Sequence, residues 1–154
     1  METPKPMPAL PPIAAESSPP PGARATVFGL GQGTLLLVED QDFIAGYLAE
    51  IFTRAGLAVV RTSDGAGALR VLAEQGAEVR LAMIDHGLPD MQGDELCVRL
   101  RGLVPGLPVM LTSGRELEGC REKLALSGPT WFAAKPYRTA QLVDQVRALM
   151  MTAA

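Results

Sequence analysis

The chain has 154 residues, of which 47% are hydrophobic and 20% charged, and its formal net charge at pH 7 is −3. This length is enough for one domain with its own core. The charge balance provides no basic surface for nucleic acid, no apolar run is long enough to cross a membrane, and the N-terminus lacks a secretory signal. Cys97 and Cys120 form no metal or redox motif. We therefore expect a cytoplasmic protein with no direct nucleic-acid or membrane partner.

Residues 1–32 differ in composition from the rest of the chain. Most of the 13 prolines fall within the first 21 positions, and alanine, serine and glycine fill much of the space between them. Such a segment cannot bury enough apolar surface to offset the entropy lost on ordering. We predict a disordered, proline-rich tail over residues 1–32, followed by one domain over residues 33–152.

From Thr34 onward, short apolar runs alternate with segments of helical periodicity. The runs that read as strands are 34–38, 57–60, 81–84, 109–111 and 130–134. The segments that read as helices are 41–54, 64–76, 92–103, 116–126 and 139–151. In the first of these helices the apolar residues at helical spacing are Phe43, Ile44, Tyr47, Leu48 and Ile51. Alternation of this kind predicts an α/β fold, a flavodoxin-like (βα)5 three-layer sandwich whose parallel sheet has the strand order 2-1-3-4-5.

Several of the predicted strands end in residues suited to one chemistry. Glu39 and Asp40 follow the first strand, Asp85 the third, Thr112 the fourth and Lys135 the fifth. Because the carboxyl ends of parallel strands share one edge of the sheet, these side chains are expected to meet. Clustered carboxylates call for a hard divalent cation such as Mg²⁺, while a lysine and a hydroxyl suit a phosphoryl group. The set is that of an aspartyl-phosphate site.

Two residues at the third strand end also have simpler interpretations. Asp85 alone could be an aspartate that only opens a turn, and it is the other strand ends that favour the chemical interpretation. His86 is the only histidine and adjoins Asp85. Its side chain is expected to point away from that of Asp85, because neighbours in an extended strand face opposite sides.

Four segments together resemble the CheY-like receiver domain of two-component response regulators. They are Leu37-Val38-Glu39-Asp40, Ile84-Asp85 through Gln92-Gly93, Pro108 through Gly114, and Ala134-Lys135-Pro136-Tyr137. The resemblance extends from Thr34 to Met151, and the segment Pro108–Gly114 is similar to receivers attached to hybrid histidine kinases. It implies a signalling domain in a phosphorelay, one that at most catalyses its own phosphorylation and dephosphorylation.

The resemblance also assigns roles around the acidic residues. Asp85 would accept a phosphoryl group from a histidine kinase or a histidine phosphotransfer protein. Asp40 and Asp85 would bind Mg²⁺ directly, with Mn²⁺ as an alternative ion. Glu39 would act through a water molecule, and the backbone carbonyl of Gly87 would complete the protein ligands.

Further roles follow for the last two strands. Thr112 would donate a hydrogen bond to the phosphoryl group, as would the backbone N–H of Ser113, and Lys135 would pair with its charge. On phosphorylation Thr112 would move toward the phosphate, and Phe132 would swing into the space it leaves. Many relatives have tyrosine at this position. Phe132 has no hydroxyl, so signalling that depends on the tyrosine hydroxyl is not expected here. The resemblance further implies a cis bond before Pro136.

The remaining expectations concern partners and alternatives. The surface of the fourth helix, fifth strand and last helix would change on phosphorylation, meeting a downstream protein or a second copy of the chain. No output module is recognisable, and Met1 favours a free-standing protein over a fragment of a hybrid kinase. A pseudo-receiver that binds partners without phosphorylation is the alternative function. A phosphatase of the haloacid dehalogenase type would need a second aspartate at position 87, which is glycine.

Overall fold

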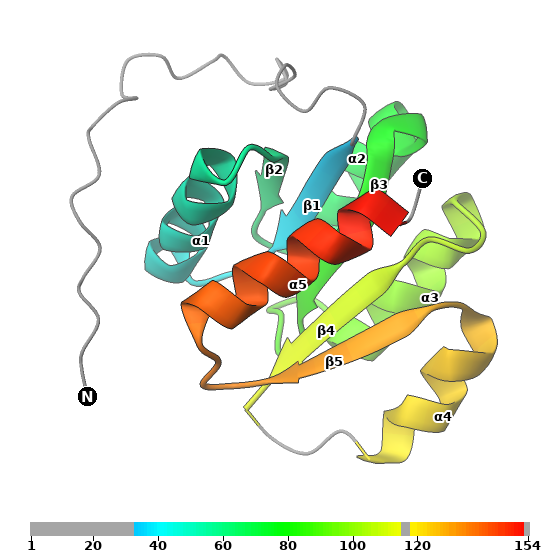
Figure 1. Ribbon diagram of the computed structural model, residues 1–154. Helices are drawn as coiled ribbons and strands as arrows, with labels where there is room; N and C mark the ends of the chain where they lie inside the picture. Colours follow the sequence, from blue (N-terminus) through cyan, green and yellow to red (C-terminus); the bar gives the residue numbers. More distant parts are fainter. Residues whose placement is uncertain (1–32, 115–117, 153–154) are drawn as a thin grey trace.

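The computed structural model describes residues 33–114 and 118–152 (Figure 1). Its five strands form one parallel sheet in the order β2-β1-β3-β4-β5. The strands are β1 (Thr34–Val38), β2 (Ala58–Thr62), β3 (Val79–Asp85), β4 (Val109–Ser113) and β5 (Thr130–Ala134). The helices are α1 (Asp42–Arg54), α2 (Gly65–Gln75), α3 (Gly93–Leu103), α4 (Glu118–Ser127) and α5 (Thr139–Thr152), with a 3₁₀ turn at Gly76–Glu78. This is the predicted architecture and strand order. The predicted tail, residues 1–32, lies outside the described residues.

Helices cover both faces of the sheet and make three layers (Figure 1). Side chains alternate between the faces along each strand, so Leu35 and Leu37 pack with α1 and α5, whereas Leu36 and Val38 pack with α2, α3 and α4. All four are at most 1% exposed, because β1 is covered on both sides. None of the described helices is long and apolar enough to span a membrane.

The strands extend further toward the carboxyl edge of the sheet than the apolar runs indicated. β3 includes Asp85 and β4 continues to Ser113, and Asp85 is the register partner of Thr112. β2 likewise begins one residue later and ends two residues later than predicted. Polar residues at strand ends interrupt the apolar pattern without interrupting the main-chain pairing. Asp85, Thr112 and Ser113 are therefore part of the sheet itself, which fixes their relative positions.

The helical spacing of α1 suggested a wider buried face than the structure has. Phe43 is 85% exposed and Tyr47 is 43% exposed. The buried side of α1 consists of Ala45, Leu48 and Phe52 instead. Since α1 shares its face of the sheet with α5, it contacts the sheet along a narrow stripe, and the two aromatic residues fall outside that stripe.

The loop between β3 and α3 is fastened to the start of α2. Asp90 Oδ1 accepts a hydrogen bond from the backbone N–H of Gly65 at 2.8 Å, and its Oδ2 accepts one from Ala66 at 3.0 Å. Asp64 caps the same helix by accepting from Gly67 N–H at 2.8 Å. The hydrogen bonds from Gly65 and Ala66 hold the pKa of the Asp90 carboxyl below its usual value.

Gly93 lets this loop close tightly against the sheet. Its N–H donates to His86 O at 2.7 Å. A Cβ at position 93 would lie 2.8 Å from His86 Cα and 3.0 Å from Asp85 O. Only glycine allows α3 to begin this close to the end of β3.

Arg101 joins α3 to the carboxyl end of α4 and the segment that leads into β5. The residue is 6% exposed, and its guanidinium donates to Leu107 O at 2.9 Å, to Leu124 O at 3.2 Å and to Ser127 Oγ at 2.8 Å, and also to Pro129 O. Burial lowers the pKa of the guanidinium. In the described part of the chain no carboxylate forms an ion pair with Arg101, so three backbone carbonyls and the Ser127 hydroxyl offset the cost of burying its charge.

Replacing Arg101 by methionine is expected to lower the free energy of unfolding by about 2–4 kcal/mol, because several buried acceptors lose a charged donor. Urea unfolding followed by circular dichroism measures this change. The matched control is Arg99→Met on the same helix, where an exposed arginine bonds Glu95 and the loss should stay below about 1 kcal/mol. Equal losses in the two variants would contradict the role given to Arg101.

Asp90→Asn should destabilise the protein in a pH-dependent way. Because the folded-state pKa of Asp90 is lowered, the carboxylate contributes its stability above the unfolded pKa of about 3.9 and loses it as the pH falls through the folded value. Urea unfolding should therefore show a less stable variant at pH 7 and a shrinking difference from the wild type below about pH 4. A difference that stays constant from neutral to acid pH would rule out this carboxylate as the source.

Candidate functional site

The carboxyl edge of the sheet is held by main-chain hydrogen bonds that continue beyond the strands. Glu39 N donates to Thr62 O at 3.1 Å, and Lys135 N donates to Ser113 O at 2.9 Å. His86 N donates to Thr112 O at 2.9 Å. These bonds fix the backbone at the ends of β1, β3 and β5, so the side chains that follow start from rigid positions.

Three carboxylates converge at this edge. Each of Glu39, Asp40 and Asp85 offers one oxygen, and the three oxygens all lie within 4.8 Å of one another. Glu39 and Asp85 are buried, at 4% and 9% exposure, whereas Asp40 is open to solvent. A cluster of hard oxygen ligands with one side open fits Mg²⁺, which binds through a few carboxylates and keeps water or phosphate oxygens in its other positions.

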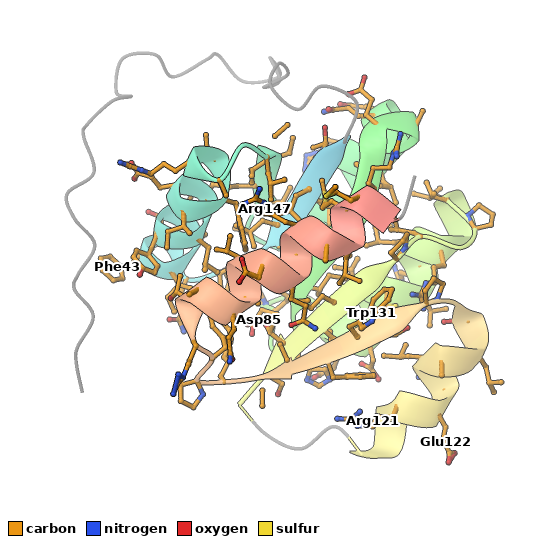
Figure 2. All side chains as sticks on the ribbon, viewed as in Figure 1. Phe43, Asp85, Arg121, Glu122, Trp131 and Arg147 are labelled. Carbon is orange, nitrogen blue, oxygen red and sulfur yellow. The ribbon has the colours of Figure 1, made fainter. Side chains whose placement is uncertain are left out.

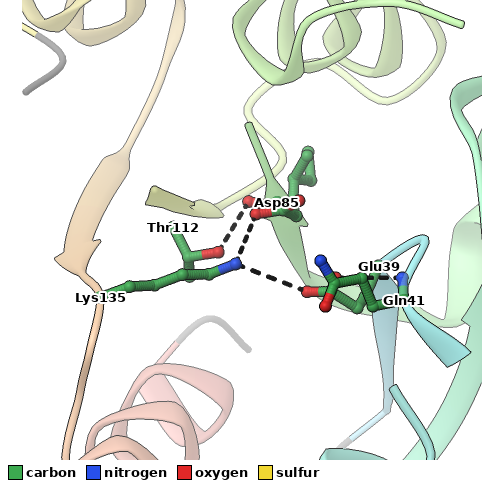
Figure 3. A network of polar contacts seen from close by, with 6 residues as sticks. Glu39, Gln41, Asp85, Thr112 and Lys135 are labelled. Atoms are coloured by element: carbon green, nitrogen blue, oxygen red, sulfur yellow. Dashed lines mark hydrogen bonds and ion pairs between the residues drawn. The ribbon is translucent and has the colours of Figure 1, made fainter. Parts of the chain in front are cut away.

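Lys135 reaches into this cluster from β5 (Figure 3). Its Nζ lies 2.8 Å from Asp85 Oδ1 and 3.8 Å from Glu39 Oε1. One ammonium against three carboxylates leaves an excess of two negative charges, which a divalent cation would neutralise.

The shifts in pKa follow from this arrangement. Burial raises the pKa of the Glu39 carboxyl, and the neighbouring charge of Asp85 raises it further. Burial also acts to lower the pKa of the Lys135 ammonium, but its hydrogen bond to Asp85 and the charges of Asp85 and Glu39 outweigh burial, so the pKa lies above its usual value. Lys135 is therefore a permanent positive charge in the site at neutral pH.

Thr112 and Ser113 lie at the end of β4, next to the acids. Thr112 is 2% exposed, and its hydroxyl donates to Ile84 O at 3.5 Å, which is a long hydrogen bond. Figure 3 shows this hydroxyl beside Lys135 and Asp85. Because this bond is long, it holds the hydroxyl only weakly.

The loop after β3 leaves the site open. A Cβ at Gly87 would meet nothing within 4 Å, and the residue forms an isolated antiparallel bridge with Gln92. His86 turns away from the cluster, as predicted, and its Nε2 lies 3.5 Å from Asp94 Oδ1 on α3. The Lys135–Pro136 bond is cis, the geometry that the resemblance implied.

Phe132 is the one predicted site residue that lies apart from the acids. It is the register partner of Leu111, one residue before Thr112, and its partly buried ring packs against the core on the α2–α3–α4 face. The guanidinium of Arg121 on α4 lies over this ring, 4.4 Å from its centroid. Glu39, Asp40, Asp85, Thr112 and Lys135 gather at the carboxyl edge of the sheet, whereas Phe132 packs against the core between the sheet and α2, α3 and α4.

The sequence-based prediction missed the residues that support the site. Asp90 and Gly93 shape the loop that carries Gly87, but in sequence they read as ordinary turn formers. Arg101, which joins α3 to α4, was also missed, because a charged residue in an otherwise regular helical pattern does not reveal whether it is buried or exposed.

Comparison with known proteins is consistent with this site. Residues 35–147 match the family model described as the response regulator receiver domain. Over 117 residues the chain is 34% identical to the transcriptional regulatory protein CreB of Escherichia coli strain K12, covering 76% of this chain and 50% of that protein. It is 28% identical over 120 residues to the sensor kinase CckA of Brucella abortus strain 2308, covering 78% of this chain and 13% of the kinase.

A solved structure shows the same fold. The CheY-like receiver domain protein of Methanospirillum hungatei JF-1 superposes with a TM-score of 0.70 at 23% identity, covering 79% of this chain and 95% of that one. The chain spans about half the length of the curated regulators that it matches. Because the family match extends over most of the sequence, the chain belongs to the response regulator receiver domains, which are signalling domains of two-component systems.

Proposed function

We propose that this receiver domain accepts a phosphoryl group on Asp85 from the phosphohistidine of a histidine kinase or a histidine phosphotransfer protein. The observation that carries the proposal is the surroundings of Asp85: two further carboxylates within 4.8 Å and an ammonium at 2.8 Å. A carboxylate that only opened a turn would need neither. Like other receivers, the domain would be a phospho-accepting switch that at most catalyses its own phosphorylation and dephosphorylation.

The acidic residues would hold the divalent cation. Asp40 and Asp85 would bind Mg²⁺ directly, Glu39 would act through water, and the Gly87 carbonyl would supply a further oxygen. Mn²⁺ could take the place of Mg²⁺. The cation would offset the negative charge of the phosphoryl oxygens and of the acids themselves. The convergence of three carboxylate oxygens on one open position supports this assignment.

The residues of this chain would then carry the transfer. A carboxylate oxygen of Asp85 attacks phosphorus in line with the donor, the bond from phosphorus to the donor's imidazole nitrogen breaks, and its electron pair stays on the imidazole. Lys135 moves its contact from the Asp85 carboxylate to a phosphoryl oxygen. The Thr112 hydroxyl and the Ser113 N–H donate to the remaining oxygens.

Phosphorylation would be read at the surface formed by α4, β5 and α5. Thr112 moves toward the new phosphoryl group, and Phe132 moves into the space that it leaves. β5 is an edge strand paired only with β4, so its free edge is accessible to a downstream protein or a second copy of the chain.

Incubation with Mg²⁺ and acetyl phosphate should add one phosphoryl group to the wild-type chain, measured as the intact mass. Asp85→Asn should abolish the addition, because the nucleophile is lost, and chelation of Mg²⁺ should do the same. Lys135→Met should reduce the rate by at least about tenfold, because one electrostatic contact to the transferring group is removed.

The matched control is Asp144→Asn, an exposed aspartate on α5, which should leave the added mass unchanged. A wild-type chain that takes up no phosphoryl group under these conditions would contradict the proposal and favour a pseudo-receiver that binds partners without phosphorylation. Steady turnover of added phosphate esters would point instead to a phosphatase.

A further inference from the structure

The contact between Arg121 and Phe132 joins α4 to the residue that is expected to move. The guanidinium carbon of Arg121 lies 4.4 Å from the centroid of the Phe132 ring, well within the distance of a favourable cation–π contact. Arg121 is exposed and Phe132 is partly buried, so the guanidinium covers the outward side of the ring. Figure 2 shows Arg121 on the side of α4 toward the sheet and Glu122 pointing away from it.

The attachment of α4 is uneven along its length. Near its carboxyl end Leu124 is fully buried, and the Leu124 carbonyl and Ser127 hydroxyl both accept from the buried guanidinium of Arg101. Before Leu124, two described side chains make contacts at the surface: Arg121 lies over Phe132, and Lys123 Nζ lies 3.7 Å from Asp94. The carboxyl end of α4 is therefore held by buried hydrogen bonds, whereas these two contacts are exposed and can be exchanged.

We propose that Arg121 is a positioning residue that holds the Phe132 ring beneath α4 and so opposes the phosphorylated state of the domain. This inference rests on the proposed function, because it concerns the movement of Phe132 that accompanies phosphorylation of Asp85. Moving the ring inward breaks the cation–π contact, so the contact stabilises only the state with the ring outward. A ligand that favours the phosphorylated state must also supply the free energy lost when this contact breaks, so it binds less tightly.

Beryllofluoride with saturating Mg²⁺ is the probe, because it mimics a phosphoryl group on Asp85 without being hydrolysed. Arg121→Gln should bind it about two- to fivefold more tightly than the wild type, which is the size expected when an exposed cation–π contact is lost. Arg121→Lys retains a cation over the ring, so its dissociation constant should lie between those of the wild type and Arg121→Gln. Isothermal titration calorimetry gives the dissociation constants, and the fluorescence of Trp131, the only tryptophan, gives a second readout.

Two controls separate this effect from a general loss of structure or charge. Arg147→Gln makes the same chemical change at an exposed position on α5 and should leave the affinity unchanged. In a Phe132→Leu background, Arg121→Gln should have no effect, because the ring it acts through is absent. Thermal unfolding of each variant shows that the chain remains folded.

The possible results test the role of Arg121 separately from the phosphorylation of Asp85. Equal or weaker binding by Arg121→Gln, with a wild type that binds beryllofluoride, would overturn the role of Arg121 and leave the proposed function intact. The same would follow if Arg121→Gln kept its full effect in the Phe132→Leu background. A wild-type chain that does not bind beryllofluoride at all would overturn the proposed function, and the inference with it.

Discussion

The ion pair between Lys135 Nζ and Asp85 Oδ1 is the contact on which the site depends. It joins β5 to β3 across the end of β4, and it is made between partly buried groups, where charges interact more strongly than in water. Without the ammonium, the oxygens of Glu39, Asp40 and Asp85 would repel one another within 4.8 Å. With it, the fold holds the three acids together and still leaves the negative charge that attracts a divalent cation.

The surrounding structure divides into a rigid frame and one less firmly held element. Main-chain hydrogen bonds continue past the strand ends, and Asp90 and Gly93 fasten the loop that follows β3. On the other face, α4 is fixed at its carboxyl end by Arg101, while Arg121 contacts Phe132 at the surface. We propose that a change of charge at Asp85 moves α4 and Phe132, because the rest of the site is held rigidly. Packed cores respond by discrete rearrangements and not by gradual deformation.

Most of the fold, and the cluster at the edge of the sheet, could be predicted because they follow from local pattern and topology. Apolar runs mark the strands, and parallel strands must bring Asp85, Thr112 and Lys135 to the same edge. The exposure of Phe43 could not be predicted, since helical spacing does not say how α1 and α5 share one face. The contact of Arg101 with Ser127 and that of Arg121 with Phe132 each join different elements of the fold, and no local signal distinguishes these arginines from ordinary surface residues.

The most direct test of the site is a crystal structure of the chain with Mg²⁺ and beryllofluoride. We predict beryllium bonded to a carboxylate oxygen of Asp85 and one Mg²⁺ among the oxygens of Glu39, Asp40 and Asp85. Lys135 Nζ and the Thr112 hydroxyl should then contact fluorides. Crystals grown with both ligands in excess that show Lys135 still paired with a bare Asp85, or the ligands bound elsewhere on the molecule, would contradict it.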